Sequence, residues 1–141
     1  MRHQSLDIRG GLYIVATPIG TATDISLRAL DLISAADVLL AEDKRQLLKL
    51  MRIHGIKLAG RRLFSYHDHN GQDQRAKVLK LLKENNSVVL VSDAGTPLIA
   101  DPGYRLVSEA IANDIYVSGA PGASSVLAAL AISGLPTDKF F

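Results

Sequence analysis

Side chains that can take up a proton stand directly after short apolar runs of the sequence. Glu42 and Asp43 follow one run, His67 and His69 follow another, and Asp101 stands beyond a third. Imidazole titrates near neutral pH, whereas a carboxylate needs a pKa raised by burial to act as a base there. These residues are therefore candidate proton acceptors. Structural alternatives stay open, because Glu42 or Asp43 can cap a helix and Asp101 can form a turn with the Pro-Gly pair after it.

The same polar residues do not complete a familiar metal or nucleophile motif. His67 and His69 flank Asp68, but no third ligand is spaced to join them, so the sequence predicts no metal site. Ser92 could form a triad with His67 and Asp93, but no G-x-S-x-G elbow surrounds the serine. No G-x-G-x-x-G follows the first apolar run and no P-loop motif occurs, which argues against a dinucleotide fold and a P-loop NTPase. The chain has no Cys, which excludes thiolate and disulfide chemistry.

Apolar, β-branched runs alternate with segments of helical periodicity along the whole chain. Strands are predicted at residues 12–16, 38–41, 63–66, 88–91 and 115–117. Helices are predicted at residues 26–36, 43–54, 72–84, 104–113 and 123–133. Asp24 or Ser26 can cap the first of these helices. Such alternation joins parallel strands through right-handed crossovers, so we expect an α/β fold with a five-stranded, mainly parallel sheet flanked by helices.

The segments after the predicted strands are rich in polar residues, Gly and Pro. They comprise residues 17–21, 42–45, 67–70, 92–97 followed by 101–104, and 119–125. The connectors at the opposite strand ends, residues 35–37, 59–60 and 85–87, are ordinary by comparison. Ligands of open parallel sheets bind beyond the carboxyl ends of the strands, and Gly and Pro permit close approach of backbone to ligand. The asymmetry between the two edges therefore predicts a ligand site along the carboxyl edge.

The composition fits one domain that can bury a core, since the chain has 141 residues and 48% hydrophobic content. Residues 1–10 are polar and mixed, and no apolar run reaches membrane-spanning length. We therefore expect a cytoplasmic protein without a membrane partner, with an N-terminal tail at residues 1–10 and the domain at residues 11–141. Two adjacent phenylalanines end the chain with nothing to bury them, so we expect the natural protein to continue beyond Phe141.

The net charge of +2 is unevenly distributed. Seven basic side chains and no acidic one stand between Lys44 and Arg62. This stretch either meets phosphates or forms a solvated helix face followed by a basic loop. The charge pattern alone does not decide between the two interpretations.

Five different segments of the chain have the character of sequence motifs. They are residues 12–20 (LYIVATPIG), 41–45 (AEDKR), 65–70 (SYHDHN), 91–104 (VSDAGTPLIADPGY) and 133–138 (SGLPTD). Together they resemble the small-subunit rRNA methyltransferase I branch of the tetrapyrrole methylase superfamily, over the chain from about Gly11 to its end. The resemblance implies an enzyme that uses S-adenosylmethionine to methylate a ribose 2′-hydroxyl of a cytidine in 16S rRNA of the 30S subunit. It further implies a two-domain homodimer with the cofactor between the domains, of which the C-terminal domain is absent from this chain.

The resemblance assigns cofactor binding to the segments after the first, fourth and fifth strands. The residues concerned are Pro18, Ile19, Asp93, Ala94, Gly95, Thr96, Ile99, Ser124 and Ser125. The two serines stand at a helix start, where free N–H groups favour a carboxylate, although capping alone also explains them. The chain departs from the usual pattern of the branch at residues 21–23, 44, 46–47 and 120–124. The branch usually has Gly at position 23, where this chain has Thr. The loop after the first strand is therefore expected to depart from the usual geometry of the branch.

The resemblance assigns binding of the RNA that accepts the methyl group to the segments after the second and third strands. The catalytic candidates are Glu42, Asp43 and Asp101. The candidates for contact with RNA are Arg45, Lys49, Arg52, His67, His69 and Tyr104. The first three of these follow helical spacing and can track an RNA backbone, while the tyrosine can stack on or hydrogen-bond a nucleotide.

Two other functions remain open from the sequence. A C-methyltransferase acting on a porphyrin-like ring would need a broad apolar pocket and less basic charge than residues 44–62 carry. A cofactor- or RNA-binding module without catalysis would fit a chain that supplies only half of a cleft.

Overall fold

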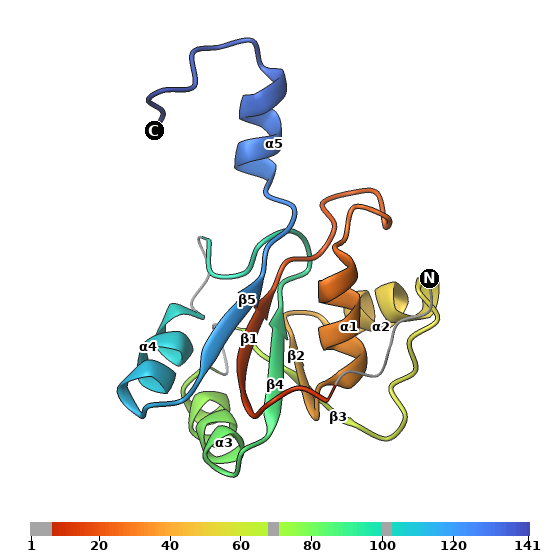
Figure 1. The fold of residues 1–141 in the computed structure, drawn as a ribbon, viewed down its shortest axis with the longest axis vertical. Helices are drawn as coiled ribbons and strands as arrows, with labels where there is room; N and C mark the ends of the chain where they lie inside the picture. The colour runs from red at the N-terminus through yellow and green to blue at the C-terminus, as the bar shows by residue number, and fades with distance from the viewer. Residues whose placement is uncertain (1–6, 68–70, 100–102) are drawn as a thin grey trace.

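The computed structural model describes residues 7–67, 71–99 and 103–141 and confirms the predicted α/β fold. The strands are β1 (Gly11–Val15), β2 (Val38–Ala41), β3 (Arg62–Ser65), β4 (Ser87–Val91) and β5 (Val117–Ala120). The helices are α1 (Leu27–Ala35), α2 (Lys44–Ile53), α3 (Gly71–Lys83), α4 (Tyr104–Ala112) and α5 (Ser125–Ile132). The sheet has the order β3-β2-β4-β1-β5 and every pairing in it is parallel (Figure 1).

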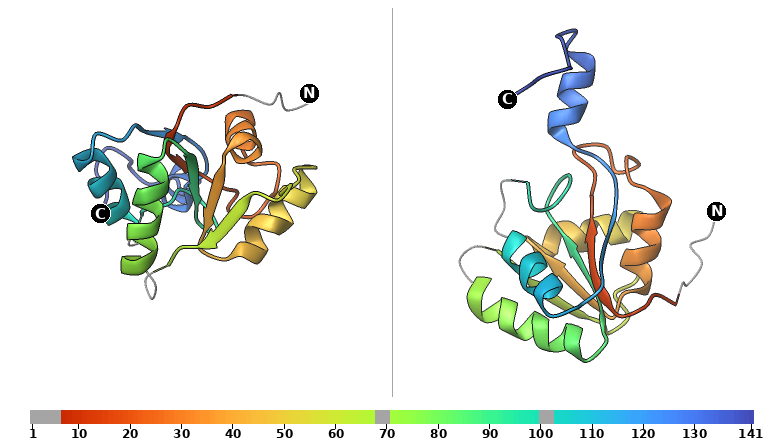
Figure 2. Two further views of the ribbon diagram at one scale, coloured as in Figure 1. Left: turned by 90° about the horizontal axis from the view of Figure 1, so that it is seen from below. Right: turned by 60° about the vertical axis from the view of Figure 1, so that its left-hand side comes forward.

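Helices cover both faces of the sheet. Helices α1 and α2 lie on one face and α3 and α4 on the other (Figure 2). Side chains of each strand alternate between the two faces: Leu39 and Val89 pack with α1 and α2, whereas Leu40 and Leu90 pack with α3 and α4. Strand β4 is buried at all of its positions because it has a neighbour on each side and helices on each face.

The strands end level with one another, which places their outgoing loops side by side. In the register of the sheet Ser65 lies opposite Ala41, and Ala41 lies opposite Val91. Val91 lies opposite Val15, which in turn lies opposite Ala120. The chain therefore leaves all of the strands at the same level, at the carboxyl edge predicted to hold the ligand site.

The connections diverge between the two neighbouring strands β1 and β4. Helix α1 carries the chain from β1 past β4 to β2 on one face of the sheet. Helix α4 carries it from β4 past β1 to β5 on the other face. Ligands of open α/β sheets bind where successive connections part in this way, because the two outgoing loops leave a crevice between them. The crevice is thus expected beyond Val15 and Val91.

The amino edge of the sheet is closed by hydrogen bonds rather than left open. Ser87 is 1% exposed, and its backbone N–H and hydroxyl donate to Oδ2 of Asp37 over 2.8 and 2.7 Å. The backbone N–H of Asp37 donates in return to Oγ of Ser87 over 3.0 Å. These bonds fix the starts of β2 and β4 relative to each other.

The fifth strand differs from its prediction. It spans Val117–Ala120 instead of residues 115–117, so Gly119 and Ala120 belong to the strand and not to the loop after it. Apolar periodicity missed this because the strand contains Ser118 and Gly119, which are not β-branched. A side chain at Gly119 would place its Cβ 3.1 Å from the carbonyl oxygen of Ile14, so the close pairing with β1 favours glycine there.

Arg61, in the basic stretch of residues 44–62, has a structural role. Arg61 belongs to the structure of the domain, because its guanidinium donates to the carbonyl oxygens of Ile33, Ala36, Leu58 and Lys57 over 2.7–3.0 Å. Two of these carbonyls lie at the carboxyl end of α1, where helix oxygens lack intrahelical partners. Arg61 is therefore a capping group and not part of a phosphate-binding patch.

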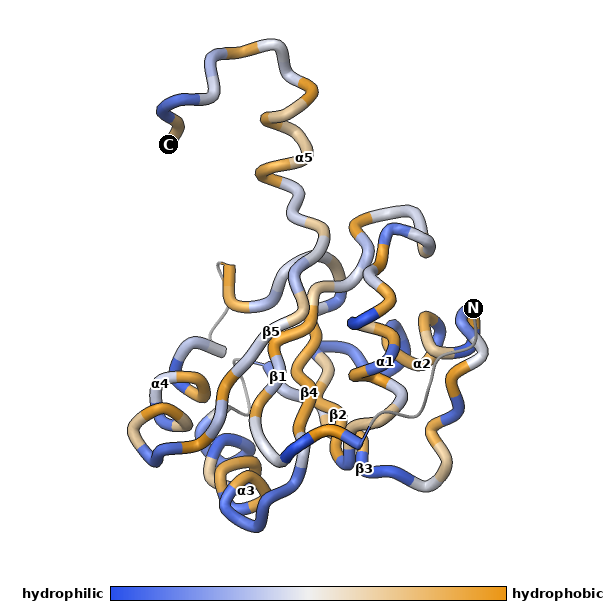
Figure 3. Tube along the Cα trace, in the orientation of Figure 1, coloured by the Kyte–Doolittle hydropathy of each residue, from blue (hydrophilic) through white to orange (hydrophobic). Residues whose placement is uncertain are grey.

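Helix α5 stands away from the rest of the domain beyond the carboxyl edge (Figure 1). Its sequence is apolar on all sides, as the hydropathy colours of Figure 3 show, yet none of its residues is buried. Ser124 caps its start by accepting from the N–H of Leu127 over 3.5 Å. A soluble helix with this pattern is normally buried, so α5 exposes an apolar surface.

We predict that Arg61→Lys lowers the free energy of unfolding by about 1–3 kcal/mol. An ammonium cannot reach four carbonyls in the geometry of a planar guanidinium, so some of these oxygens lose their donors. The matched control is Arg62→Lys on the adjacent, exposed residue, which should change stability by less than about 0.5 kcal/mol. Urea unfolding of both variants measures the difference, and equal midpoints would contradict the capping role.

Candidate functional site at the carboxyl edge

A two-residue bridge joins the loops that leave β1 and β4. The N–H of Thr17 donates to the carbonyl of Gly95 over 3.0 Å, and the N–H of Gly95 donates back to the carbonyl of Thr17 over 3.0 Å. The hydroxyl of Thr17, a residue only 3% exposed, also donates to the carbonyl of Ser92 over 3.2 Å. The bridge spans the point where the connections diverge, and it fixes the β1 loop (residues 16–26) against the β4 loop (residues 92–99).

Glycine fits position 95 of this bridge without strain, whereas a residue with a side chain does not. Its φ of +78° lies in the left-handed region, which side chains other than glycine rarely adopt. A Cβ at this position would lie 3.3 Å from Cγ2 of Ile19 and 3.5 Å from the carbonyl oxygen of Ala123. The backbone of three loops thus meets around Gly95.

The β5 loop (residues 121–124) is held to the β4 loop on the other side of the bridge. The hydroxyl of Thr96 donates to the carbonyl of Ala123 over 2.9 Å. Gly122 lies so close to Ala16 that a Cβ on it would come within 2.8 Å of the alanine side chain. The structure therefore brings together the predicted cofactor residues of the three segments, with Ser124 and Ser125 at the start of α5. Ile99 is 68% exposed at the end of the described part of the β4 loop.

The acidic candidates are held together by reciprocal hydrogen bonds between the β2 and β4 loops. The N–H of Asp43 donates to Oδ1 of Asp93 over 2.8 Å. The N–H of Asp93 donates to Oε2 of Glu42 over 3.2 Å. Glu42, Asp43 and Asp93 therefore form one acidic clasp at the carboxyl edge. Asp101, the third catalytic candidate, lies outside the described residues.

Within this clasp, the carboxylate of Asp43 is occupied by structural contacts. It accepts from the backbone N–H of Arg45 over 2.9 Å, which caps the start of α2, and pairs with the guanidinium of Arg45 over 2.8 Å. The side-chain hydrogen bonds from Arg45, followed by its backbone hydrogen bond, hold the pKa of Asp43 below its usual value. A carboxylate with a lowered pKa is a weak proton acceptor. The carboxylate of Glu42, an exposed residue, is engaged by the backbone N–H of Asp93.

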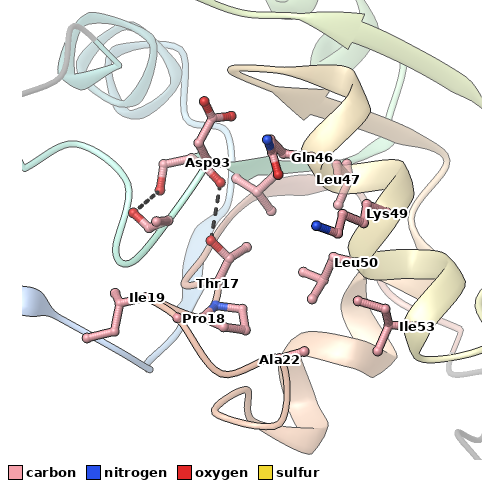
Figure 4. A pocket seen from close by; sticks show the side chains of 14 residues that line it. Thr17, Pro18, Ile19, Ala22, Gln46, Leu47, Lys49, Leu50, Ile53 and Asp93 are labelled. Carbon is pink, nitrogen blue, oxygen red and sulfur yellow. Dashed lines mark hydrogen bonds between the residues drawn. The ribbon is translucent and has the colours of Figure 1, made fainter.

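A cavity of about 290 Å³ lies between the β1 loop, the β4 loop and one face of α2 (Figure 4). Pro18, Ile19, Asp93 and Ala94 line it among the predicted cofactor residues, and Lys49 lines it among the predicted RNA residues. Figure 4 shows the side chain of Lys49 directed into the cavity from α2. The cavity thus joins the side assigned to the cofactor with the side assigned to the RNA.

Several functional contacts of this region have no counterpart among the predicted residues. The cavity wall includes Gln46, Leu50 and Ile53, which occupy the same face of α2 as Lys49. His54 ends α2, and its Nε2 lies 2.8 Å from the carbonyl oxygen of Ala22, which ties the helix end to the β1 loop. Helical periodicity around Lys49 could have identified the first three, whereas the contact of His54 with Ala22 depends on tertiary structure.

Other predicted RNA residues lie away from the cavity. His67 is half-buried shortly after β3, the edge strand furthest from β1. Tyr104 begins α4 on the opposite face of the sheet, is 58% exposed, and accepts a hydrogen bond from Nε of Arg105 over 3.2 Å. His69 lies outside the described residues. Neither His67 nor Tyr104 lines the cavity.

Arg28 is a further residue that acts on the site through the backbone. It lies on α1 and its guanidinium donates to the carbonyl of Gly119 and to the hydroxyl of Ser118. These bonds connect α1 to the end of β5, immediately before the β5 loop. The arginine thereby contributes to the position of the loop that carries Ser124.

Two other features are absent from the part of the chain that the structure describes. No group of three or more His, Cys, Asp or Glu side chains there is arranged to hold a metal ion. None of the helices described is long and apolar enough to span a membrane.

Comparison with known proteins identifies the family. The family model described as Tetrapyrrole (Corrin/Porphyrin) Methylases matches residues 11–141, nearly the whole chain. The chain belongs to the tetrapyrrole methylase family. The resemblance found in the motif segments is thereby confirmed.

Curated relatives of this tetrapyrrole methylase domain carry the name "Ribosomal RNA small subunit methyltransferase I". The protein of Mesorhizobium japonicum is 51% identical over 129 residues, which cover 92% of this chain and 43% of the relative. The protein of Escherichia coli O157:H7 is 46% identical over 140 residues, which cover 99% of this chain and 48% of the relative. The chain therefore spans about half the length of these curated relatives.

Solved structures confirm the fold. A conserved hypothetical protein from Aeropyrum pernix K1 superposes with a TM-score of 0.73 at 20% identity, covering 95% of this chain and 46% of that protein. A uroporphyrin-III-C-methyltransferase from Thermus thermophilus superposes with a TM-score of 0.66 at 24% identity, covering 91% of this chain and 53% of that protein. At these identities the likeness concerns the tetrapyrrole methylase fold alone.

We predict that Gly95→Ala destabilises this tetrapyrrole methylase domain by about 1–2 kcal/mol, the cost of a left-handed backbone in a residue with a side chain. The amide of Thr17, which depends on the bridge, should also exchange its hydrogen faster. The matched control is Gly20→Ala in the β1 loop, where a Cβ would meet nothing within 4 Å. Urea unfolding and amide exchange measure both effects, and an unchanged exchange rate at Thr17 in Gly95→Ala would contradict the role of the bridge.

We also predict that Arg45→Ala raises the pKa of Asp43, because the side-chain hydrogen bonds that stabilise the ionised carboxylate are lost. A lowered folded-state pKa contributes stability above the unfolded-state pKa, and this stability is lost as the pH falls through the folded-state value. The variant should therefore lose less stability between neutral and acidic pH than the parent. Carboxyl ¹³C NMR measures the pKa, and Arg52→Ala at the far end of α2 is the control that should leave it unchanged.

Proposed function

We propose that this tetrapyrrole methylase domain is the N-terminal half of an enzyme that transfers a methyl group from S-adenosylmethionine to the ribose 2′-hydroxyl of a cytidine in 16S rRNA of the small ribosomal subunit. The observation that carries the proposal is the cavity that joins the bridged β1 and β4 loops to the basic helix α2. The name carried by relatives at 43–51% identity supports the choice of rRNA as the substrate.

The groups around Gly95 fit the requirements of this cofactor. The tightly packed backbone of the β1, β4 and β5 loops offers N–H and carbonyl groups that a ligand can approach closely, since Gly95 and Gly122 carry no side chain. The first N–H groups of α5, next to Ser124 and Ser125, can receive a carboxylate. The carboxylate of Asp93 can receive an ammonium group. Once bound, S-adenosylmethionine supplies a methyl group on a positively charged sulfur that a nucleophile can attack.

The remaining predicted cofactor residues complete the proposed binding surface with apolar and backbone contacts. They are Pro18, Ile19, Ala94, Thr96 and Ile99. Holding donor and acceptor in line supplies much of the rate in such a displacement, so a rigid loop arrangement is an advantage in itself. The bridge between Thr17 and Gly95 supplies that rigidity.

The acceptor hydroxyl loses its proton as the new C–O bond forms, so a base must lie near it. We assign this role first to Glu42, because the carboxylate of Asp43 is engaged by Arg45 and has a lowered pKa. Asp43 then acts by holding Asp93 and the start of α2 in place. Asp101 stays a proposed catalytic residue on the strength of the sequence resemblance alone.

The RNA is proposed to follow the basic face of α2. Arg45, Lys49 and Arg52 share this face by helical spacing, and together they can neutralise consecutive phosphates. His67, His69 and Tyr104 would contact RNA further from the cavity, if the substrate extends over β3 and α4. The separation of Arg61 from this face leaves α2 as the main positive element of the site.

A second domain is proposed to cover α5 and close the cofactor site. The helix is apolar, carries no buried residue and directly follows the β5 loop, so a partner that packs on it would also stand beside the cofactor groups. The whole protein is proposed to form a homodimer. We expect the 141-residue chain alone to bind the cofactor weakly and to turn over little substrate, because part of the pocket would come from the second domain.

The proposed activity is tested with the full-length protein, labelled S-adenosylmethionine and 30S subunits from a strain that lacks the modification. We expect label in 16S rRNA at one cytidine, and resistance of the adjacent phosphodiester to alkali, because a 2′-O-methyl group removes the nucleophile of alkaline cleavage. Glu42→Gln should lower kcat by about 100-fold or more. Its matched control is Glu84→Gln at the end of α3, on the amino side of the sheet, which should leave kcat unchanged.

The same assay separates the alternatives. Label on a base, or no label on any RNA, would overturn the proposal. Label transferred instead to a porphyrin-like ring would indicate the C-methyltransferase activity that the names of some fold neighbours describe. Binding of RNA and cofactor without any transfer by the full-length protein would indicate a non-catalytic module.

A further inference from the structure

We propose that the cavity between the β1 loop and α2 holds the single nucleotide that is to be methylated, and not the cofactor. Its base and sugar would lie against the apolar wall, and its 5′-phosphate at Lys49. The inference rests on the proposed function, which it deepens by naming the acceptor subsite and its residues.

The position of the cavity separates it from the cofactor groups at Thr96 and in the β5 loop, while it shares Pro18, Ile19, Asp93 and Ala94 with the proposed cofactor surface. It is lined by the β1 loop, by α2 and by the start of the β4 loop as far as Ala94. Thr96 and the β5 loop, which are linked by the hydrogen bond to Ala123, are not part of its wall. Asp93 and Ala94, which line the cavity and also belong to the groups proposed for the cofactor, therefore mark the boundary between the two. An acceptor hydroxyl at this boundary would contact the methyl donor directly, as in-line attack requires.

The size and lining of the cavity suit one nucleoside. A volume of about 290 Å³ lies at the lower limit for small-molecule sites, whereas the cofactor carries a whole amino acid in addition to its nucleoside. Leu50, Ile53 and Pro18 give the cavity an apolar side. Ile53 is 54% exposed, so its surface is available to a sugar or base. Apolar side chains exposed in a concave site are a common sign of ligand binding.

The polar groups at the cavity match a nucleotide in charge and in hydrogen bonding. Lys49 is directed into the cavity, and among the described residues it takes part in no ion pair (Figure 4). An unpaired ammonium beside an apolar wall favours a phosphate attached to an apolar group. Gln46 lines the same cavity and offers both a carbonyl acceptor and an amide donor, which complement the amino group and ring nitrogen of cytosine.

The inference is tested by NMR on the 141-residue chain with cytidine 5′-monophosphate, cytidine, inorganic phosphate and S-adenosylhomocysteine as separate probes. We expect the monophosphate to shift the Ile53 methyl and Gln46 amide signals saturably, and inorganic phosphate to leave the Ile53 methyl unmoved. S-adenosylhomocysteine should shift signals of Gly95, Thr96 and Ser124 and should not compete with the monophosphate.

Matched variants separate the contributions of the phosphate and of the apolar wall. Lys49→Ala should weaken binding of the monophosphate about fivefold, equivalent to about 1 kcal/mol, and should leave cytidine binding unchanged. Its control is Lys83→Ala at the end of α3. Ile53→Ala should weaken both probes by a similar factor, and its control is Ile111→Ala, an exposed isoleucine on α4. Both changed side chains are exposed, so the fold is retained.

The outcomes distinguish this inference from the proposed function. Displacement of the monophosphate by S-adenosylhomocysteine, or the absence of any saturable shift at Ile53, would overturn the inference and leave ribose methylation by the full-length protein standing. Shifts that inorganic phosphate reproduces in full would also overturn it, since they would show anion binding only. Binding at Ile53 and Gln46 without ribose methylation by the full-length protein would instead refute the proposed function.

Discussion

The antiparallel bridge between Thr17 and Gly95 is the contact on which the arrangement of this site depends. Parallel strands that end level would otherwise release their loops into solvent with nothing to set their separation. The bridge joins the two loops at the point where the connections of the sheet diverge, and the buried hydroxyl of Thr17 adds a bond to Ser92. Because Gly95 also lies against Ile19 and Ala123, the same contact sets the positions of the β1, β4 and β5 loops at once.

The acidic clasp extends this arrangement to the β2 loop. Asp93 receives a hydrogen bond from the backbone of Asp43, and its own backbone donates to Glu42, so two loops from adjacent strands hold each other. A cluster of carboxylates would repel itself if every oxygen faced the others. Here each of the three carboxylates accepts a backbone N–H, and that of Asp43 also pairs with the guanidinium of Arg45. The clasp thus keeps negative charge at the site through backbone hydrogen bonds and the ion pair with Arg45.

The sequence predicted the fold and the edge of the sheet that carries the site, because both follow from local patterns. β-branched runs alternating with helical periodicity specified the strands and helices, and the concentration of Gly and Pro after the strands specified the edge. Strand β5 was misplaced because Ser118 and Gly119 pack by close backbone approach to β1, for which apolar periodicity has no signal. Arg61 could not be separated from its basic neighbours because its role depends on carbonyls of α1 that are distant in sequence. Thr17, His54 and Arg28 were missed for the same reason.

The division of the positive charges has a consequence for how the site can recognise a polyanion. Arg61 donates to carbonyls within the fold, and Arg45 is paired with Asp43. Lys49 follows Arg45 on α2 and is directed into the cavity, and it is held by no carboxylate in the described part of the chain. Under the proposed function, an RNA strand that meets α2 would find Lys49 unpaired at the cavity and Arg45 paired with Asp43 at the start of the helix. Such an arrangement favours a register in which one phosphate reaches Lys49 while the attached sugar enters beside Asp93, and this register brings a ribose hydroxyl to the boundary with the proposed cofactor groups, where it can contact the methyl donor directly.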